Sequence, residues 1–240
     1  MPASTQTEDK NAEIQAFFDG WEIYRTVIDR NFMSHRELGD ALVAHFANRP
    51  SGGRFLDLGC GDADMTSRVI RESRFTNYLG VDLAEIALQH ARENLKTTGA
   101  DVDLRQADLG EFVKTANGPF DAIVVGYSLH HFTREEKSEF FAAISDQQLL
   151  APGGELLVYD VFCEPNETRE AYLDRYLAMC GQIWDAYTER QMEMIDEHIR
   201  GRDFPEEQGE FVELARQAGL SGGDELWRDH TGFHRLIRFT

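Results

Sequence analysis

A glycine turn flanked by acids is the first stretch of this chain that could bind a ligand. Residues 54–66 read RFLDLGCGDADMT, an apolar run followed by Gly59, Gly61, Asp62 and Asp64. The apolar run predicts a buried strand, and the pattern that follows predicts a helix. In open α/β sheets ligands bind beside such a turn, where glycine lets them approach the main chain closely.

The acids of the turn discriminate between classes of nucleotide. The dinucleotide fingerprint Gly-x-Gly-x-x-Gly needs glycine at position 64, where this chain has Asp64, and no Gly-Lys-Ser/Thr follows the turn. Asp62 and Asp64 would also repel a pyrophosphate at the helix N-terminus. They do not oppose a cation without phosphate. The charge pattern therefore argues against NAD and ATP and favours S-adenosylmethionine (SAM), which carries a sulfonium and an ammonium group.

Four successive motifs resemble those of class I SAM-dependent methyltransferases over roughly residues 50–163. The motifs are Asp57-Leu-Gly59-Cys60-Gly61, Gly80-Val-Asp82-Leu83, Gln106-Ala-Asp108-Leu109 and Phe120-Asp-Ala-Ile-Val-Val-Gly126. The resemblance implies that SAM is the cofactor and S-adenosylhomocysteine (SAH) the product. The cofactor contacts that it implies come from Asp57, Gly59, Cys60, Gly61, Asp82, Leu83, Asp108, Leu109 and Gly126.

Two of these acids end predicted strands and have distinct expected roles. Asp82 could accept hydrogen bonds from both ribose hydroxyls, which are strong because the acceptor is charged. The alternative is that Asp82 caps the helix predicted from Ala84 to Lys96. The resemblance implies that Asp108 receives the exocyclic amine of adenine.

The residues that follow the strand over 120–127 are expected to face the methyl acceptor. Tyr127, His130 and His131 are the candidate catalytic residues. A hydroxyl or protonated amine must lose a proton, and histidine titrates near neutrality. Neighbouring side chains diverge, so only one histidine should point into the pocket; alternatively both pack around the methionine tail of SAM. No third ligand is positioned by sequence, so no metal site is predicted.

Helical segments outside the minimal sheet are candidates for a cover over the site. Apolar residues from Ile14 to Phe32 recur every three or four positions, and a second helix is predicted from about Ser34 to Ala47. The insert at 164–205 carries a stripe of helical spacing, made of Tyr172, Tyr176, Cys180, Ile183, Trp184 and Tyr187.

These helices have two interpretations. They pack as ordinary core over one face of the sheet, or they close over SAM and substrate, as the resemblance implies. In the second case Tyr24 and His35 face the ligand.

The predicted fold is α/β, a doubly wound and mostly parallel seven-stranded sheet with helices on both faces and a helical cap. Residues 1–12 are expected to form a disordered tail and 13–50 an N-terminal helical cap. Residues 51–240 should form the SAM-binding domain, with the insert 164–205 as a lid. The resemblance implies that the last strand runs antiparallel to the others.

Composition narrows the classes of partner. Acids outnumber bases 43 to 24 and the net charge is −19, which disfavours a nucleic-acid substrate and favours a small molecule. The first residues do not form a signal peptide, no apolar run reaches membrane-spanning length, and the three cysteines have no metal spacing. We therefore expect a cytoplasmic protein with no membrane partner; homodimer formation is left open.

The expected function is transfer of a methyl group from SAM to an oxygen or nitrogen of a small molecule. The first alternative is an RNA or protein methyltransferase, or another SAM-using enzyme of the same fold. It lacks a basic patch and an Asn-Pro-Pro-Tyr type motif, since Gly126-Tyr127-Ser128-Leu129 stands there instead. The second is a non-catalytic partner subunit, against which the intact glycine turn, Asp82 and Asp108 argue.

Overall fold

The computed structural model describes residues 20–49 and 52–240. The predicted tail at 1–12 and the predicted start of the first helix at Ile14 lie outside the described residues. Among the residues that are described, no helix is both long and apolar enough to cross a membrane.

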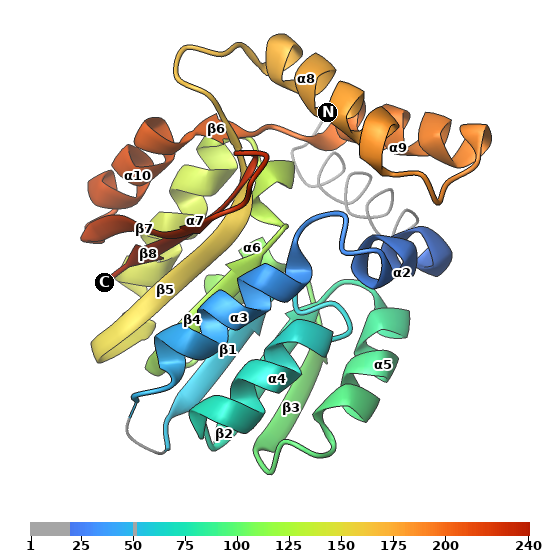
Figure 1. The fold of residues 1–240 in the computed structure, drawn as a ribbon. Helices are drawn as coiled ribbons and strands as arrows, with labels where there is room; N and C mark the ends of the chain where they lie inside the picture. Colours follow the sequence, from blue (N-terminus) through green and yellow to red (C-terminus); the bar gives the residue numbers. More distant parts are fainter. Residues whose placement is uncertain (1–19, 50–51) are drawn as a thin grey trace, which may run out of the picture.

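A mostly parallel sheet forms the centre of the molecule (Figure 1). Its strand order is β3 (Asp101–Gln106), β2 (Asn77–Asp82), β1 (Arg54–Leu58), β4 (Phe120–Gly126), β5 (Leu150–Cys163), β8 (His234–Phe239) and β7 (Gly222–Arg228). β8 runs antiparallel to both of its neighbours. The predicted seven-stranded sheet and its antiparallel last strand are confirmed. A two-residue strand, β6 (Glu206–Glu207), pairs with β5 off this path.

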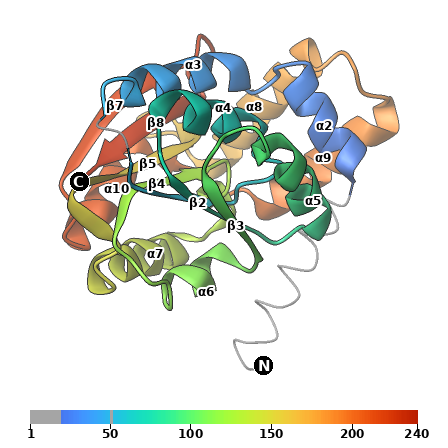
Figure 2. The same ribbon diagram turned by 90° about the horizontal axis from the view of Figure 1, so that it is seen from below.

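Helices cover both faces of the sheet (Figure 2). One face carries α3 (His35–Phe46), α4 (Asp64–Ser73) and α5 (Glu85–Leu95), and the other carries α6 (Leu109–Val113), α7 (Arg134–Asp146) and α10 (Gln208–Gln217). The sequence does not predict α6, because five residues are too few for a periodic pattern. Thr133 and Glu136 form a capping box at the start of α7.

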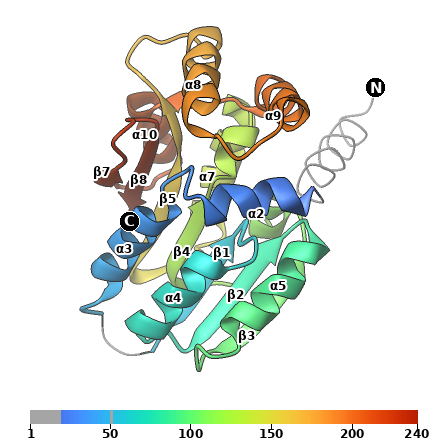
Figure 3. The ribbon, with the colours of Figure 1, turned by 45° about the vertical axis from the view of Figure 1, so that its right-hand side comes forward.

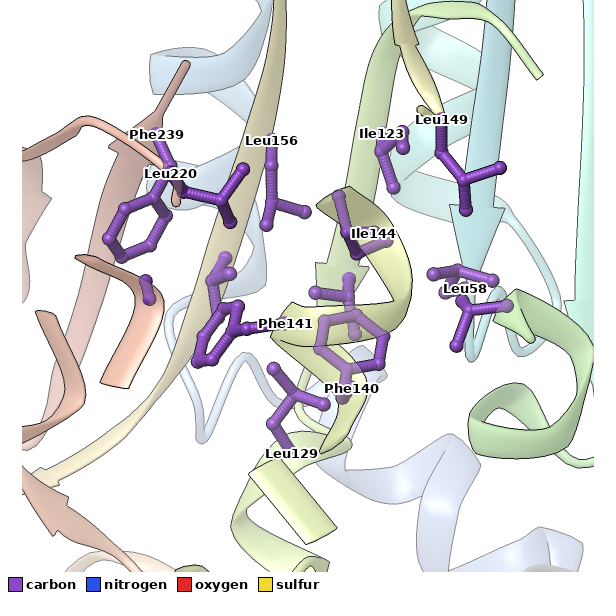
Figure 4. Close-up of a cluster of buried hydrophobic side chains, with 14 of the residues drawn as sticks. Leu58, Ile123, Leu129, Phe140, Phe141, Ile144, Leu149, Leu156, Leu220 and Phe239 are labelled. Atoms are coloured by element: carbon purple, nitrogen blue, oxygen red, sulfur yellow. The ribbon is translucent and has the colours of Figure 1, made fainter. Parts of the chain in front are cut away.

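Alternation along the strands separates two hydrophobic clusters, one on each face. Leu56 and Leu58 of β1 face the α7 side, and Phe55 faces the α3 side. Figure 4 shows part of the α7-side cluster, in which Phe140 and Phe141 pack against side chains of the strands. Both clusters hold the sheet rigid, so that the residues at its carboxyl edge keep fixed positions.

A third hydrophobic cluster joins α2 (Trp21–Asp29) to the insert helices α8 (Arg169–Ile183) and α9 (Glu189–Arg202). Figure 3 shows α2 between these two helices and the strand ends. Phe32 stacks on Trp184 with ring centroids 5.4 Å apart, and Tyr187 donates a 2.7 Å hydrogen bond to the carbonyl of Ile23. The N-terminal helix and the insert therefore form one cap, although about 150 residues separate them along the chain.

Two details of the predicted cap helices are wrong. The first helix ends at Asp29 rather than Phe32, because Asn31 and Ser34 take left-handed backbone angles that turn the chain into α3. The stripe of helical spacing was expected to reach Tyr187, but α8 ends at Ile183, and Trp184 and Tyr187 lie between it and α9, which Thr188 starts with a capping box. Apolar periodicity alone does not reveal such a break.

We expect Phe141→Ala to lower the free energy of unfolding by about 3–5 kcal/mol, because it leaves a cavity in the α7-side cluster. Leu226→Ala is the matched control, since Leu226 is 36% exposed, and should change stability by less than about 1 kcal/mol. Urea titration followed by circular dichroism measures both values. Equal losses in the two variants would contradict the assignment of Phe141 to the core.

Candidate functional site

A cavity of about 460 Å³ opens at the carboxyl ends of β1, β2, β4 and β5, and residues of α2, α8 and α9 complete its wall. Pockets of this size accommodate cofactors and small molecules. All but one of the predicted site residues line it: Tyr24, His35, Gly59, Cys60, Gly61, Asp82, Leu83, Asp108, Leu109, Gly126, Tyr127, His130 and His131.

Asp57 is the predicted site residue that the structure keeps away from the cavity wall. Its carboxylate is fully buried on the α3 side of β1, where the hydroxyl of Tyr78 donates a 2.6 Å hydrogen bond to Oδ2. Burial raises the pKa of Asp57 to about 6. Alternation along the strand points this side chain into the protein, and its contact with the cofactor stays a prediction.

The glycine turn is shaped by two close contacts. Gly61 has φ +54°, and a Cβ atom there would lie 2.4 Å from the hydroxyl of Tyr24, so only glycine fits. The amide of Gly61 donates a 2.8 Å hydrogen bond to Asp82 Oδ2, and the amide of Ala84 donates another of 2.8 Å to Asp82 Oδ1. Asp82 therefore ties the turn after β1 to the start of α5, and it also lines the cavity.

An ion pair attaches the cap to the same turn. Arg25 of α2 lies 3.1 Å from Asp62 Oδ2, and Asp62 is only 2% exposed. Burial raises the pKa of Asp62 and, together with the charge of Asp62, that of Tyr24. The sequence predicts that Asp62 repels phosphate. In the structure its ion pair with Arg25 also holds α2 over the site.

At the far edge of the sheet, Asp108 caps a helix as well as lining the cavity. Its Oδ1 accepts a 2.8 Å hydrogen bond from the amide of Glu111 in the first turn of α6. This contact fixes the side chain beside Leu109, which also lines the cavity.

Tyr127 positions the cap rather than offering a base. Its hydroxyl donates a 2.6 Å hydrogen bond to the carbonyl of Met33, and burial raises its pKa well above the ordinary value. The ring lies edge-on to His35, with centroids 5.2 Å apart. Gly126 beside it leaves room for the ring of Tyr159, which a Cβ atom would strike at 1.7 Å.

The two histidines point into the cavity together. They lie in a short 3₁₀ turn, Leu129–His131, and their ring centroids are 4.0 Å apart. The expectation that only one would face the pocket is wrong. It assumes strand-like divergence, whereas three residues per turn separate successive side chains by only about 120°.

Two further acids surround the histidines. His130 Nδ1 lies 2.5 Å from Asp160 Oδ1 of β5, and the amide of His130 donates to Asp160 Oδ2 at 3.1 Å. From the insert, Asp203 Oδ1 lies 3.3 Å from His131 Nδ1 and 3.9 Å from His130 Nε2. Burial opposes protonation of His130, but the carboxylates of Asp160 and Asp203 raise its pKa overall. Burial and the charge of His130 lower the pKa of His131.

The sequence shows no sign that Asp203 belongs to this group. It is brought there by the way the insert returns to the sheet: the amide of Phe204 donates a 2.6 Å hydrogen bond to the carbonyl of His130, and the ammonium of buried Lys137 donates to the carbonyl of Phe204. His198 of α9 joins the cluster, its ring centroid 5.3 Å from that of His131. The burial of Lys137, which helps to fix this return, is likewise visible only in the structure.

The central part of the chain is similar in sequence to known methyltransferases. Residues 55–154 match a family model described as a methyltransferase domain. The ubiquinone biosynthesis O-methyltransferase of Nitrosococcus oceani is 32% identical over 123 residues, which are 51% of this chain and 48% of that protein. The demethylmenaquinone methyltransferase of Leptospira interrogans is 29% identical over 136 residues, covering 55% and 52%. The chain thus spans about half the length of these curated relatives.

The whole fold is similar to that of a solved structure. Magnesium protoporphyrin IX methyltransferase from Synechocystis PCC 6803, with bound SAH, superimposes with a TM-score of 0.68 at 14% identity. The superposition covers 96% of this chain and 98% of that one. The cap and the sheet thus occur together in another protein of this architecture.

His35 should make the protein less stable in mild acid. Burial, with a contribution from His234, lowers the pKa of His35 from its ordinary value of 6.5 to about 4. The unfolded chain therefore binds more protons between these values, and stability falls as the pH falls from 6.5 to 4. His35→Gln should lose up to about 3 kcal/mol less than the wild type over this interval. Urea titrations at several pH values measure the difference, and parallel curves would contradict the assignment.

Proposed function

We propose that this chain, whose residues 55–154 match a methyltransferase domain, is a class I SAM-dependent methyltransferase that transfers a methyl group from SAM to an oxygen or nitrogen of a small molecule. The observation that carries the proposal is one cavity whose wall joins the glycine turn, Asp82 and Asp108 to His130 and His131.

The cofactor would occupy the end of the cavity at β1 and β2. Asp82 lines this end, and its two oxygens, with about four acceptor positions between them, have capacity for ribose hydroxyls beside the amides of Gly61 and Ala84. Asp108 lies beside Leu109 at the next strand end, where an adenine amine would find an acceptor. Asp62, Asp64 and Asp82 line the same end and favour a cationic ligand over a phosphate.

The acceptor would occupy the other end, beneath the cap. Tyr176, Trp184, Ile195 and Ile199 supply an apolar wall there, and the histidine cluster supplies the polar groups. Such a pocket, mostly apolar with a few converging polar side chains, suits a small organic molecule. The curated relatives include an O-methyltransferase, which supports oxygen as the methylated atom.

The mechanism requires alignment above all. Methyl transfer is an in-line displacement at a carbon that already carries a good leaving group, and positioning the reactants can contribute about 7–11 kcal/mol. The rigid strand ends hold the cofactor, and the cap excludes water from the reacting atoms. The histidine cluster adjoins the acceptor, where the proton of a hydroxyl or amine must be lost.

The other functional classes have less support. A macromolecular substrate needs a broad open surface, and for RNA a basic one, whereas this chain has a net charge of −19 and a cavity partly covered by a cap. A non-catalytic subunit does not require a cluster of histidines and carboxylates buried at the far end of the cavity.

SAH should raise the melting temperature of the protein, whereas NADH and ATP should not. A ligand that binds only the folded state at 100 times its dissociation constant stabilises by about 2.7 kcal/mol. Differential scanning fluorimetry at equal ligand concentrations measures the shifts. Stabilisation by NADH in the absence of any shift with SAH would contradict the proposed cofactor.

Asp82→Ala should weaken SAH binding by roughly 1.5–3 kcal/mol, because charged hydrogen bonds to the ribose and the support of Gly61 are lost. Asp103→Ala is the control, since Asp103 is an exposed acid of β3 that pairs with Arg105. Isothermal titration calorimetry on both folded variants measures the affinities. Wild-type affinity in Asp82→Ala would exclude the ribose contact.

A further inference from the structure

Three side chains from two separate segments converge at the acceptor end of the cavity. His130, His131 and Asp203 each present a ligand atom, and these atoms lie within 4.8 Å of one another. Asp203 Oδ1 lies 3.3 Å from His131 Nδ1 and 3.9 Å from His130 Nε2. With metal–ligand bonds of about 2.1 Å, neighbouring ligand atoms lie roughly 3.0–3.5 Å apart. The spacing is therefore close to that of a metal site before an ion has drawn its ligands together.

Asp203 is buried with its Oδ1 atom facing the two histidine rings. The residue is 4% exposed, and its Oδ1 atom receives no hydrogen bond of normal geometry. An ionised carboxylate in such a place is costly unless a cation faces it. Two ring nitrogens face this oxygen. His131 Nδ1 lies 3.3 Å from it and His130 Nε2 lies 3.9 Å from it.

The second ring nitrogen of His130 is held as in metal sites. Asp160 Oδ1 lies 2.5 Å from Nδ1, which orients Nε2 towards Asp203. A carboxylate behind a histidine in this manner fixes the tautomer and strengthens the imidazole as a ligand. Asp160 is itself fixed, because its carboxylate accepts hydrogen bonds from the amides of His130 and Val161.

The backbone brings the two segments together without help from a ligand. Phe204, next to Asp203, donates its amide to the carbonyl of His130, and Arg169 donates a 2.6 Å hydrogen bond to the carbonyl of Asp203. The carboxylate is thus presented to the histidines by a fixed return of the insert to the sheet. Such preorganisation reduces the cost of assembling a site.

We propose that His130 Nε2, a ring nitrogen of His131 and Asp203 Oδ1 bind one divalent first-row transition metal ion. Two imidazoles and one carboxylate suit ions such as Zn²⁺ or Fe²⁺ and leave further coordination positions open. All three residues line the cavity, so the open positions face the acceptor. His198, also in the cavity wall, lies beside the site as a neighbouring imidazole.

The metal site indicates which class of substrate the enzyme methylates, and this inference rests on the proposed methyl transfer. A small molecule with a hydroxyl oxygen would bind the open position, where the ion lowers the pKa of that hydroxyl. The proton leaves to water before transfer. The oxygen then forms its bond to the methyl carbon as the bond from carbon to sulfur breaks, giving a methyl ether and SAH, with alkoxide and sulfonium charges cancelling.

Direct metal binding tests the site without any assay of turnover. The full chain is treated with a chelator, dialysed and titrated with Zn²⁺ by calorimetry, and we expect one ion per chain. Asp203→Asn and His131→Ala should each weaken binding at least tenfold. Asp160→Asn, which leaves all three ligands in place, should weaken it about 10–100-fold. His230→Gln is the matched control, an exposed histidine whose loss should change nothing.

Thermal stabilisation by SAH serves as the check that each variant is folded. Absence of Zn²⁺ binding to the wild-type chain, or unchanged binding in folded Asp203→Asn, would overturn the metal site and leave the cluster as an acid–base group. Zn²⁺ binding by a chain that neither binds SAH nor transfers methyl groups would count against the proposed function and not against the site. Equal turnover of metal-free and metal-loaded enzyme would overturn the role in substrate binding.

Discussion

The hydrogen bond from the amide of Gly61 to Asp82 is the contact on which the site depends. It joins the turn after β1 to a partly buried carboxyl group at the end of β2. Burial raises the pKa of Asp82, and backbone donors on both of its oxygens oppose that rise. Backbone amides are the natural partners here, because they are supplied by the turn and helix that the site needs anyway. The shape of the cofactor end of the cavity therefore follows from the hydrogen bonds that Asp82 accepts from the amides of Gly61 and Ala84.

The same requirement recurs along the carboxyl edge of the sheet. Asp62 is buried against Arg25, which attaches α2, and Asp160 is buried against His130, which fixes the 3₁₀ turn. Each buried carboxylate thus recruits a donor from another segment, and each such contact positions a part of the cavity wall. Asp203 departs from this pattern, since its Oδ1 atom has no donor of normal geometry, a property it shares with Oδ1 of Asp57. The two histidine rings beside Asp203 are what single it out as a ligand.

The cap is built on a separate principle, burial of apolar surface. α2, α8 and α9 share one hydrophobic cluster that also contains Val161 and Cys163 of β5. In addition, Arg25 of α2 forms an ion pair with Asp62 of the glycine turn. The cap is therefore held against the carboxyl edge of the sheet by both apolar and polar contacts.

Local patterns determined most of the sheet and the cofactor end of the site. Strand runs, the glycine turn and the acids at strand ends each lie within a few residues of one another, so their spacing carries the information, and Gly61, Asp82 and Asp108 all line the cavity. A motif does not state which way each side chain points, so only the structure shows that Asp57 is buried on the α3 side of β1.

Only the tertiary structure decided the composition of the acceptor end. His130 and Asp203 are 73 residues apart in the chain, and nothing near Asp203 in sequence marks it; the return of the insert over α7, held by Lys137 and Phe204, brings it to the histidines. Likewise the two imidazoles lie side by side because Leu129–His131 form a 3₁₀ turn, and a segment of three residues is too short to be predicted from sequence. Contacts between residues that are far apart in the sequence depend on how whole helices and strands pack. Their energies depend on how deeply the residues are buried, which a local sequence pattern does not show.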